Sequence, residues 1–229
     1  MIVAAIVAAG YSGFSSHTLH ASFALAVLAL AAATSRMKVK LPGINGNMSV
    51  NLPFLLTAIV NLSGAEAVAI TCISTVVQCW PQKNGKFKPA QITFNVSMMA
   101  LASCLASLMF HAQWLHGMRW NSAALGLVLA TATLFLGQTA PVATIVALSE
   151  GKTAGSIWWR LAQLSFPYYV VSAGLNSMMQ TVGSHVGWGV ALAVFPVMYG
   201  IHRSYTLYFT RMTEVPRMDT LVRAAGAGA

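Results

Sequence analysis

The chain has 229 residues, of which 57% are hydrophobic and only 7% are charged. A soluble domain carries about 25% charged residues, so this composition lacks the polar surface that a water-soluble protein needs. Thirteen Lys and Arg against four acids give a net charge of +9. The basic residues lie in short loops between apolar segments, which is typical of membrane topology and argues against nucleic-acid binding.

Apolar segments follow one another along the chain and are separated by short polar stretches. They cover residues 1–14, 18–35, 53–62, 64–80, 90–110, 121–149, 157–182 and 185–202. A helix needs about 20 residues to cross a bilayer, which the longest segments reach and 53–62 does not. The sequence therefore predicts an all-α polytopic membrane bundle over residues 1–210, followed by a short cytoplasmic tail at 211–229.

The basic residues orient this bundle. If residues 53–80 form a broken or re-entrant helical hairpin that enters and leaves on one side, all but Arg119 fall on the same face. The positive-inside rule assigns that face to the cytoplasm. We therefore expect about six spans plus the hairpin, with both termini cytoplasmic; the family resemblance given below implies that the membrane is a bacterial inner membrane. The residues on the cytoplasmic face would be Arg36, Lys38, Lys40, Lys83, Lys86, Lys88, Lys152, Arg160, Arg203, Arg211, Arg217 and Arg223.

A short β-hairpin is predicted at residues 36–52. Basic residues alternate with Met37, Val39 and Leu41, a period of two that is typical of a half-buried strand. The dipeptides Pro42-Gly43 and Asn45-Gly46 then indicate turns. We expect this hairpin to lie on the cytoplasmic surface with its apolar side inward and to contact a partner protein. The candidate contact residues are Arg36, Lys38, Lys40, Asn45 and Gly46.

The break within the apolar hairpin carries a helix-capping signal. Ser63-Gly64-Ala65-Glu66 has the spacing of a capping box, with Ser at the N-cap and Glu three residues later. Glu66 is also the only acid of this region, and a carboxylate inside a membrane is a candidate functional group. The spacing favours the capping role over a proton-relay role.

Polar residues within the apolar segments are candidates for a cavity or for contacts between helices. They are Gln78, Gln91, Asn95, Gln138, Thr139 and Asn176. Gln138 and Thr139 come shortly before Pro141, and a proline within a helix frees backbone carbonyls that a ligand or polar neighbour must satisfy. The FPYY run could stack a ring-shaped ligand, although aromatic packing is the alternative. The candidate ligand-binding residues are Gln138, Thr139, Asn176, Tyr168 and Tyr169.

Histidines gather at the predicted outer side, at His17, His20, His111, His116 and His185. Histidine can sense pH or bind a metal there. The pair His17 and His20 is too isolated to define a metal site, and ordinary interfacial histidine is the alternative. The chain has no GxxxxGK[ST], GxSxG or HExxH motif and no paired carboxylates. We therefore predict no catalytic residue, no bound metal and no cofactor.

Several stretches together resemble a known kind of membrane region. They are KVKLPGINGNMSVN, TAIVNLSGAEAVAI, QITFNVSMMA, GQTAPVATIVALSEG and SFPYYVVSAGL. Residues 18–210 resemble the membrane-embedded N-terminal input region of bacterial cyclic-di-GMP signalling proteins of the GGDEF or HD-GYP type. In those proteins the last span leads into a signalling helix and an output domain. IHRSYTLYFTRM resembles the start of that helix, but the chain contains no GGDEF, HD or GYP sequence, which removes the implied enzyme activity.

A second resemblance is to the substrate-capturing S components of energy-coupling vitamin transporters, which also have about six helices and an early AxxxA face such as Ala5 and Ala9. The expected function is a non-catalytic membrane protein similar to a sensory input module, which couples a membrane or outer-side signal to a partner. The alternatives are an accessory subunit of a larger membrane complex and a substrate-binding component of a transporter. The expected partners are the lipid bilayer and another membrane or cytoplasmic protein or a second copy, with no nucleic acid.

Overall fold

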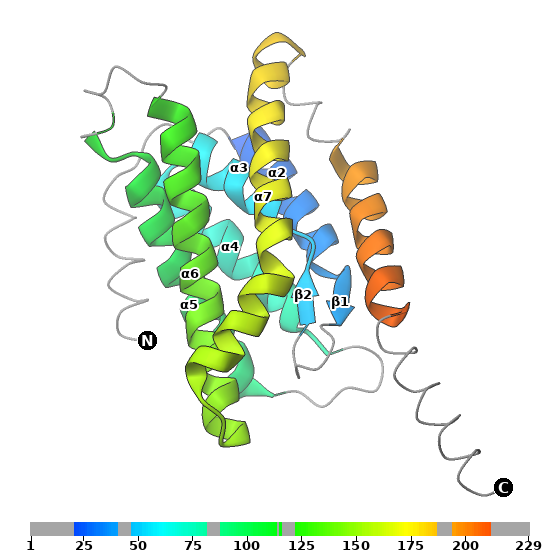
Figure 1. Ribbon diagram of the computed structural model, residues 1–229. Coiled ribbons are helices and arrows are strands. Elements are labelled where there is room, and N and C mark those ends of the chain that lie inside the picture. The colour runs from blue at the N-terminus through cyan, green and yellow to red at the C-terminus, as the bar shows by residue number, and fades with distance from the viewer. Residues whose placement is uncertain are drawn as a thin grey trace, which may run out of the picture.

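The computed structural model describes residues 21–40, 47–81, 88–113, 115, 122–186 and 194–211. These residues are mostly helical and include one small two-stranded sheet (Figure 1). The predicted combination of a helical chain with a short β-hairpin is therefore confirmed. The elements in chain order are α2 (Ala21–Ser35), β1 (Lys38–Lys40), β2 (Asn47–Ser49), α3 (Leu52–Asn61), α4 (Gly64–Cys79), α5 (Pro89–Phe110), α6 (Ser122–Glu150), α7 (Ala154–Val186) and a final helix at 194–211.

The long helices run alternately up and down the bundle (Figure 1). The lower end in Figure 1, called the ribbon end below, contains the C-terminus of α4, the start of α5 and the turn between α6 and α7. Gly151 makes that turn with a positive φ of 64°, a conformation that glycine adopts without steric cost. The amide of Lys152 then donates to the carbonyl of Ala147 at 3.0 Å, which closes the end of α6 as a Schellman motif.

Within the described residues, two helices are long and apolar enough to cross a membrane, namely α5 and α6. The helices α2, α3 and α4 are apolar but shorter. Length and composition thus support two crossings, and they do not establish the six that the sequence predicted. α7 has 33 residues but is less apolar than α5 and α6.

Part of α7 departs from the usual soluble pattern, although Ile157, Leu161 and Met179 are buried and Arg160 is exposed. Its buried residues include Ser172 and Asn176, each 0% exposed, whereas Val170 and Met178 are 53% and 64% exposed. In a water-soluble protein, polar side chains mostly lie outside and aliphatic ones inside. The outward face of α7 is therefore suited to an apolar environment, and its inward face supplies polar groups to the interior.

Small residues allow α5 and α6 to approach closely. A Cβ atom placed at Gly137 would lie only 2.8 Å from the Cβ of Ala102, so α6 requires glycine at this point. Ser103 and Ser107 on α5 are also buried. Close backbone approach at small residues is the usual basis of helix association within a membrane.

The helices α3 and α4 form a hairpin that extends along the bundle. Its tip between Leu62 and Ser63 lies near the end of α5, because Nε2 of His111 contacts the carbonyl of Ile59 at 3.1 Å. α3 has only 10 residues, as the short segment 53–62 predicted. The ribbon formed by β1 and β2 precedes α3 and covers the part of the bundle's length that the short α3 does not. The tip of the α3–α4 hairpin therefore lies at the end of the bundle opposite the ribbon end (Figure 1).

The predicted capping box at the hairpin tip is confirmed. The amide and the hydroxyl of Ser63 donate to Oε2 of Glu66 at 2.9 and 2.7 Å, and the amide of Glu66 donates back to the hydroxyl of Ser63 at 3.4 Å. These bonds satisfy amides of the first turn of α4, which have no partner within the helix. The carboxylate therefore has a local structural role at the start of α4.

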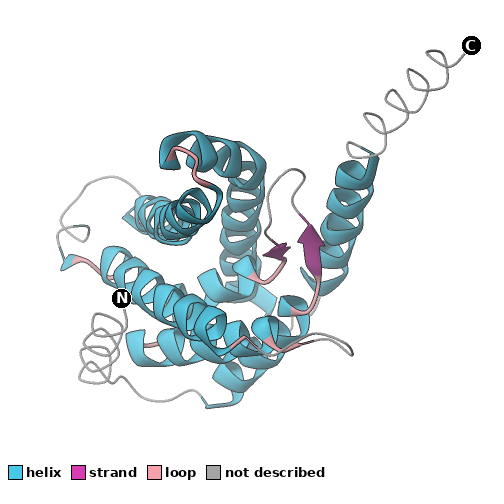
Figure 2. Ribbon diagram, turned by 90° about the horizontal axis from the view of Figure 1, so that it is seen from below, coloured by secondary structure: helices cyan, strands magenta, loops and turns pink. Residues whose placement is uncertain are grey.

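The two strands pair antiparallel, with Lys38 opposite Ser49 and Val39 opposite Met48. Val39 and Val50 are each only 1% exposed. Both views place this ribbon, β1 and β2, beside the 194–211 helix (Figures 1 and 2). The predicted turn dipeptides at 42–43 and 45–46 lie outside the described residues.

The last described helix covers the stretch that the sequence was expected to continue as a helix. The apolar segment was expected to end at residue 202, IHRSYTLYFTRM resembled the start of a signalling helix, and the structure describes helix through residue 211. Tyr205 and Phe209, four residues apart, both pack against the bundle core, and this contact extends the helix past the polar residues His202 and Arg203. The helix over residues 201–211 agrees with the expectation that the chain continues as a helix after the last apolar segment.

Candidate functional site

A cavity of about 160 Å³ lies within the ribbon-end half of the bundle. β2, α3, α4, α5, α6 and α7 all contribute to its wall. The apolar lining residues are Met48, Leu52, Leu55, Met98, Met99, Val142 and Leu161. The polar lining residues are Ser49, Asn51, Thr75, Gln78, Asn95, Gln138, Thr139, Ser165, Tyr168 and Tyr169. Among the described residues that form the wall, none is charged.

The structure brings four of the five predicted ligand-binding residues to this cavity, namely Gln138, Thr139, Tyr168 and Tyr169. Asn176 does not line it. Asn176 lies two turns further along α7 and is fully buried, where its Nδ2 donates to the hydroxyl of Thr57 at 2.9 Å. Its Oδ1 accepts a bond from Gln180 at 2.9 Å. Asn176 therefore bridges α3 and α7, the alternative role for a polar residue in a bundle.

Gln138 has an incomplete set of hydrogen bonds. The hydroxyl of Tyr169 donates to its Oε1 at 2.7 Å, while its Nε2 is buried and has no partner among the described residues. If the amide were turned over, the tyrosine hydroxyl would accept from Nε2 and the carbonyl oxygen would be left over instead. One end of this amide thus lacks a protein partner in either orientation, in the wall of the cavity.

Tyr168 connects the cavity wall to the start of α3. Its hydroxyl accepts a hydrogen bond from the amide of Leu52 at 3.0 Å. Leu52 is the first residue of α3, and Asn51 before it makes no side-chain cap. The amides of Phe54 and Leu55 bond to the carbonyl of Asn51, and position 53 is a proline without an amide hydrogen. The tyrosine therefore replaces the missing cap from a different helix.

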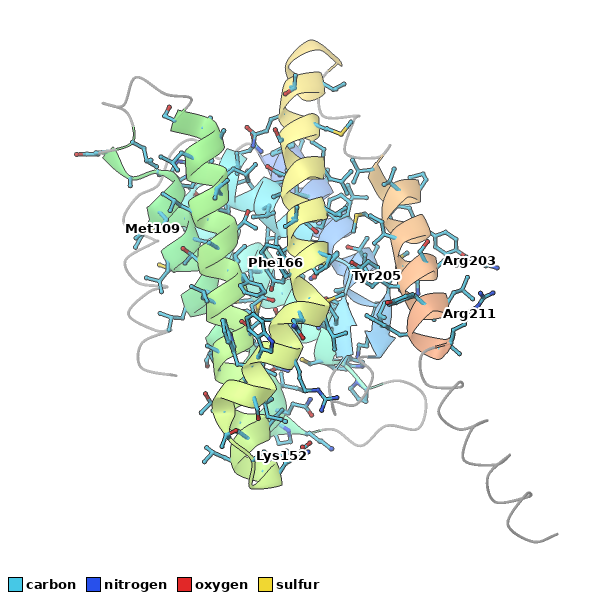
Figure 3. The ribbon with its side chains drawn as sticks, viewed as in Figure 1. Met109, Lys152, Phe166, Arg203, Tyr205 and Arg211 are labelled. Carbon is cyan, nitrogen blue, oxygen red and sulfur yellow. The ribbon has the colours of Figure 1, made fainter. Side chains whose placement is uncertain are left out.

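The rings of the FPYY run pack against aromatic neighbours. Tyr169 lies edge-to-face on Phe135 with ring centroids 5.1 Å apart, and Tyr168 lies edge-to-face on Tyr205 at 6.5 Å. Phe166 is 57% exposed on the outer side of α7 (Figure 3). These contacts match the packing alternative, while the hydroxyl ends of the two tyrosines reach the cavity region.

Thr139 is already satisfied within the protein. Its hydroxyl donates to the carbonyl of Phe135 at 2.7 Å and accepts from the indole N–H of Trp158 at 3.1 Å. Thr139 therefore shapes the wall and joins α6 to α7, and Gln138 remains the residue with a free bonding position.

Several lining residues were not singled out from the sequence as ligand contacts. Gln78 and Asn95 were identified only as buried polar residues, and Asn95 donates to the sulfur of Cys79 at 3.2 Å. Ser49 donates to Oδ1 of Asn51 at 2.8 Å, and it lies in the hairpin predicted at residues 36–52. Gln91 was predicted to be buried, which is wrong: it is exposed, because α5 begins at Pro89 and this residue lies in its first turn.

The candidate partner-contact residues are only partly described. Arg36 is exposed, and its guanidinium donates to the carbonyl of Val77 near the C-terminus of α4 at 3.3 Å. Lys38 is half-buried on the ribbon. The side chain of Lys40 and the residues Asn45 and Gly46 lie outside the described part of the chain.

Most of the candidate outer-side histidines also lie outside the described residues: His17, His20, His116 and the side chain of His185. His111 is described and contacts the α3 carbonyl given above. Within the described ranges no three His, Cys, Asp or Glu side chains are placed to hold a metal ion.

The geometry can be set beside what is known of other proteins. No family model, no curated protein and no solved structure matches this chain. A function must therefore be inferred from the cavity and from the arrangement of helices around it.

Proposed function

We propose that this chain is a multi-pass integral membrane protein that binds a small neutral molecule in the ribbon-end cavity and signals occupancy to a partner. It would act without chemistry of its own, in the manner of a sensory input module. The observation that carries the proposal is the buried, half-satisfied amide of Gln138 in a polar, uncharged wall. A buried polar atom without a partner costs about 1–3 kcal/mol, which a bound hydrogen-bonding group would recover.

Insertion into a membrane is supported by helix length and by side-chain distribution. α5 and α6 are long and apolar enough to cross, and α7 exposes Val170, Val171 and Met178 while it buries Ser172 and Asn176. In this proposal about six helices and the α3–α4 hairpin cross a bacterial inner membrane. The ribbon end faces the cytoplasm because Lys152 and Arg211 lie toward it (Figure 3).

Cysteine labelling in intact cells tests this topology. In a background without native cysteines, Lys152→Cys should be protected from an impermeant maleimide, and Gln113→Cys at the opposite end should react. The protein should also remain in the membrane pellet after carbonate extraction. Release by carbonate, or labelling of Lys152→Cys from outside, would contradict the proposed insertion.

The uncharged wall and the small volume of the cavity limit the charge and the size of a ligand. A charged molecule would leave an unpaired charge in the cavity, which costs several kcal/mol. The volume of about 160 Å³ is close to that of an engineered cavity of about 150 Å³ that binds benzene in another protein. We therefore expect a neutral molecule of roughly six to ten non-hydrogen atoms with a hydroxyl or amide group, which can bond to either end of the Gln138 amide.

The ribbon provides a route for coupling. Met48, Ser49 and Asn51 belong to the cavity wall, and the bond from Leu52 to Tyr168 joins this strand to α7. A ligand that contacts this wall would favour one position of the ribbon relative to α7 over others. A partner that reads the ribbon would then respond to occupancy.

A thermal-shift screen measures ligand binding directly. The purified protein in nanodiscs would be screened with neutral amides, phenols and small alcohols, together with charged analogues of each. A neutral compound should raise the unfolding temperature, and Gln138→Leu should abolish that shift. Gln91→Leu is the matched control, because Gln91 is exposed and does not line the cavity. An equal shift in Gln138→Leu would refute the assigned site.

A second measurement separates a sensor from a transporter component, which could use the same cavity. An environment-sensitive fluorophore at Lys38→Cys should change its emission when the compound identified above is added. The same fluorophore at Lys152→Cys should not. Binding without a response at the ribbon would reject the sensory role and favour the substrate-binding alternative.

A further inference from the structure

The cavity is closed toward the tip of the α3–α4 hairpin. Leu52 and Leu55 of α3 form part of its wall, and α3 continues from there toward the tip with almost every side chain buried. Phe54, Leu56 and Ile59 are each 0% exposed. α3 packs against α2, α4, α5, α6 and α7, so it occupies the centre of the bundle. This buried helix therefore separates the cavity from the end of the bundle at the tip.

The surface that would face lipid does not open into the cavity either. Exposed apolar side chains of the long helices include Leu105 on α5, Leu136 on α6 and Val170 on α7. Within the described part of the chain, no strongly exposed large apolar side chain lines the cavity. The residues that α7 contributes to the wall, such as Leu161 and Ser165, are all buried. The long helices thus separate the cavity from the lipid-facing surface.

The exposure of the lining residues rises toward the ribbon end, where α4 ends and α5 begins (Figure 1). On α4, Thr75 is 2% exposed, whereas Gln78, about one turn nearer that end, is half-buried. On α5, Met98 and Met99 are buried, whereas Asn95, about one turn nearer that end, is half-buried. α4 and α5 are neighbours in the bundle. The same change on two neighbouring helices indicates that the cavity opens at the ribbon end.

The mouth of the cavity, defined by Met48, Gln78 and Asn95, is polar and uncharged. All three residues are half-buried lining residues. Met48 belongs to β2, so the ribbon forms one side of the mouth, and Arg36 bonds to the carbonyl of Val77 beside Gln78. Two carboxamides at the mouth can bond to water or to a polar solute that passes them. An acyl chain would gain no such bonds there.

We propose that the cavity is loaded from the cytoplasm through this mouth. Its ligand is then a small, neutral, water-soluble molecule of the cytoplasm, and not a membrane lipid or an outer-side signal. The polar groups at the mouth and in the wall replace hydrogen bonds that such a molecule loses when it leaves water, which lowers the cost of its desolvation. This inference rests on the proposed function and on the proposed orientation, in which the ribbon end is cytoplasmic.

Thiol accessibility in sealed membrane vesicles tests the inference. In a background without native cysteines, Thr75→Cys would be treated with a sulfonate-bearing methanethiosulfonate, a charged reagent that crosses bilayers poorly. Thr75 lies three residues, about 4.5 Å, inward from Gln78, so the reagent can reach it while the sulfonate stays at the mouth. Lys152→Cys identifies the vesicles whose ribbon end faces the reagent. In those vesicles Thr75→Cys should react at least about tenfold faster than in vesicles of the opposite orientation.

Thr71→Cys is the matched control. Thr71 and Thr75 lie four residues apart on α4, are 0% and 2% exposed, and each donates to a helix carbonyl at 2.7 Å. Thr71 does not line the cavity, so Thr71→Cys should stay unmodified in both orientations. Gln78→Cys lies at the mouth and should react from the same side as Thr75→Cys, and faster. This second variant keeps the test valid if Thr75→Cys fails to fold.

Modification of Thr75→Cys from the side opposite to Lys152→Cys would overturn the inference. Modification only by the lipid-soluble N-ethylmaleimide, modification by neither reagent, or equal modification of Thr71→Cys would overturn it as well. Labelling of Lys152→Cys from outside intact cells would reject the cytoplasmic source. The proposed function fails separately: no compound would then raise the unfolding temperature, even with the expected sidedness of Thr75→Cys. If a compound binds through Gln138 while the thiol is reached from elsewhere, only this inference fails.

Discussion

The two ends of the α3–α4 hairpin are held together in different ways. At the tip, Ser63 and Glu66 bond to each other within a single helical turn. At the ribbon end, the amide of Leu52 bonds to a tyrosine 116 residues away, and Arg36 bonds to Val77 across 41 residues. The tip is therefore a local structure, whereas the ribbon end depends on the assembled bundle and contains the cavity.

The largest effect is expected at the long-range contact. Tyr168→Phe removes the hydroxyl that accepts from Leu52 and leaves a buried amide without a partner, which should lower the free energy of unfolding by about 1–3 kcal/mol. Thermal unfolding in nanodiscs measures this loss. Tyr199→Phe is the control, since Tyr199 is 50% exposed on the last helix. Equal stabilities of the two variants would show that the ribbon end does not depend on this bond.

A smaller effect is expected at the hairpin tip. Ser63→Ala removes the N-cap of α4 and should cost about 1 kcal/mol of stability, with the exposed Ser149→Ala as control. Glu66→Gln keeps an acceptor at the same place and should cost little, because glutamine also forms capping boxes. If Glu66→Gln lost more stability than Ser63→Ala, the carboxylate charge would have a role beyond capping.

The smallest effect is expected for Arg36→Gln. The bond of Arg36 to the α4 carbonyl is exposed to solvent, so its loss should change the free energy of unfolding by less than about 0.5 kcal/mol. The same thermal unfolding experiment, compared with Lys152→Gln, gives this value. A loss as large as that of Tyr168→Phe would mean that Arg36 is a main support of the ribbon end.

The same contrast explains how much could be predicted from the sequence. The capping box and the strand alternation involve residues within a few positions of one another, so the spacing of these residues in the sequence was sufficient to predict both features. Gln138 and Thr139 were selected because they precede Pro141, and Tyr168 and Tyr169 because their rings could stack on a ligand. The structure places all four at the cavity. Their ligand remains a prediction.

Other features depend on packing that spacing does not encode. Asn176 was predicted with the cavity, but it bonds to Thr57 because α3 and α7 are neighbours in the bundle. Ser49 and Asn51 line the cavity because the ribbon packs beside the helices. Helix beyond residue 202 was expected from the resemblance, but the packing of Tyr205 and Phe209 against the core could not be predicted from the sequence pattern.

The bond between Leu52 and Tyr168 also constrains the order in which the chain can fold during synthesis. The capping box at Ser63 can form as soon as α4 leaves the ribosome, but α3 receives its cap only after 116 further residues have been made. At about 5–20 residues per second this interval is roughly 6–23 s. During this interval the tip of the α3–α4 hairpin can be capped while the first amide of α3 has no partner. When α7 packs against the bundle, Tyr168 bonds to that amide and α7 also completes the wall of the cavity.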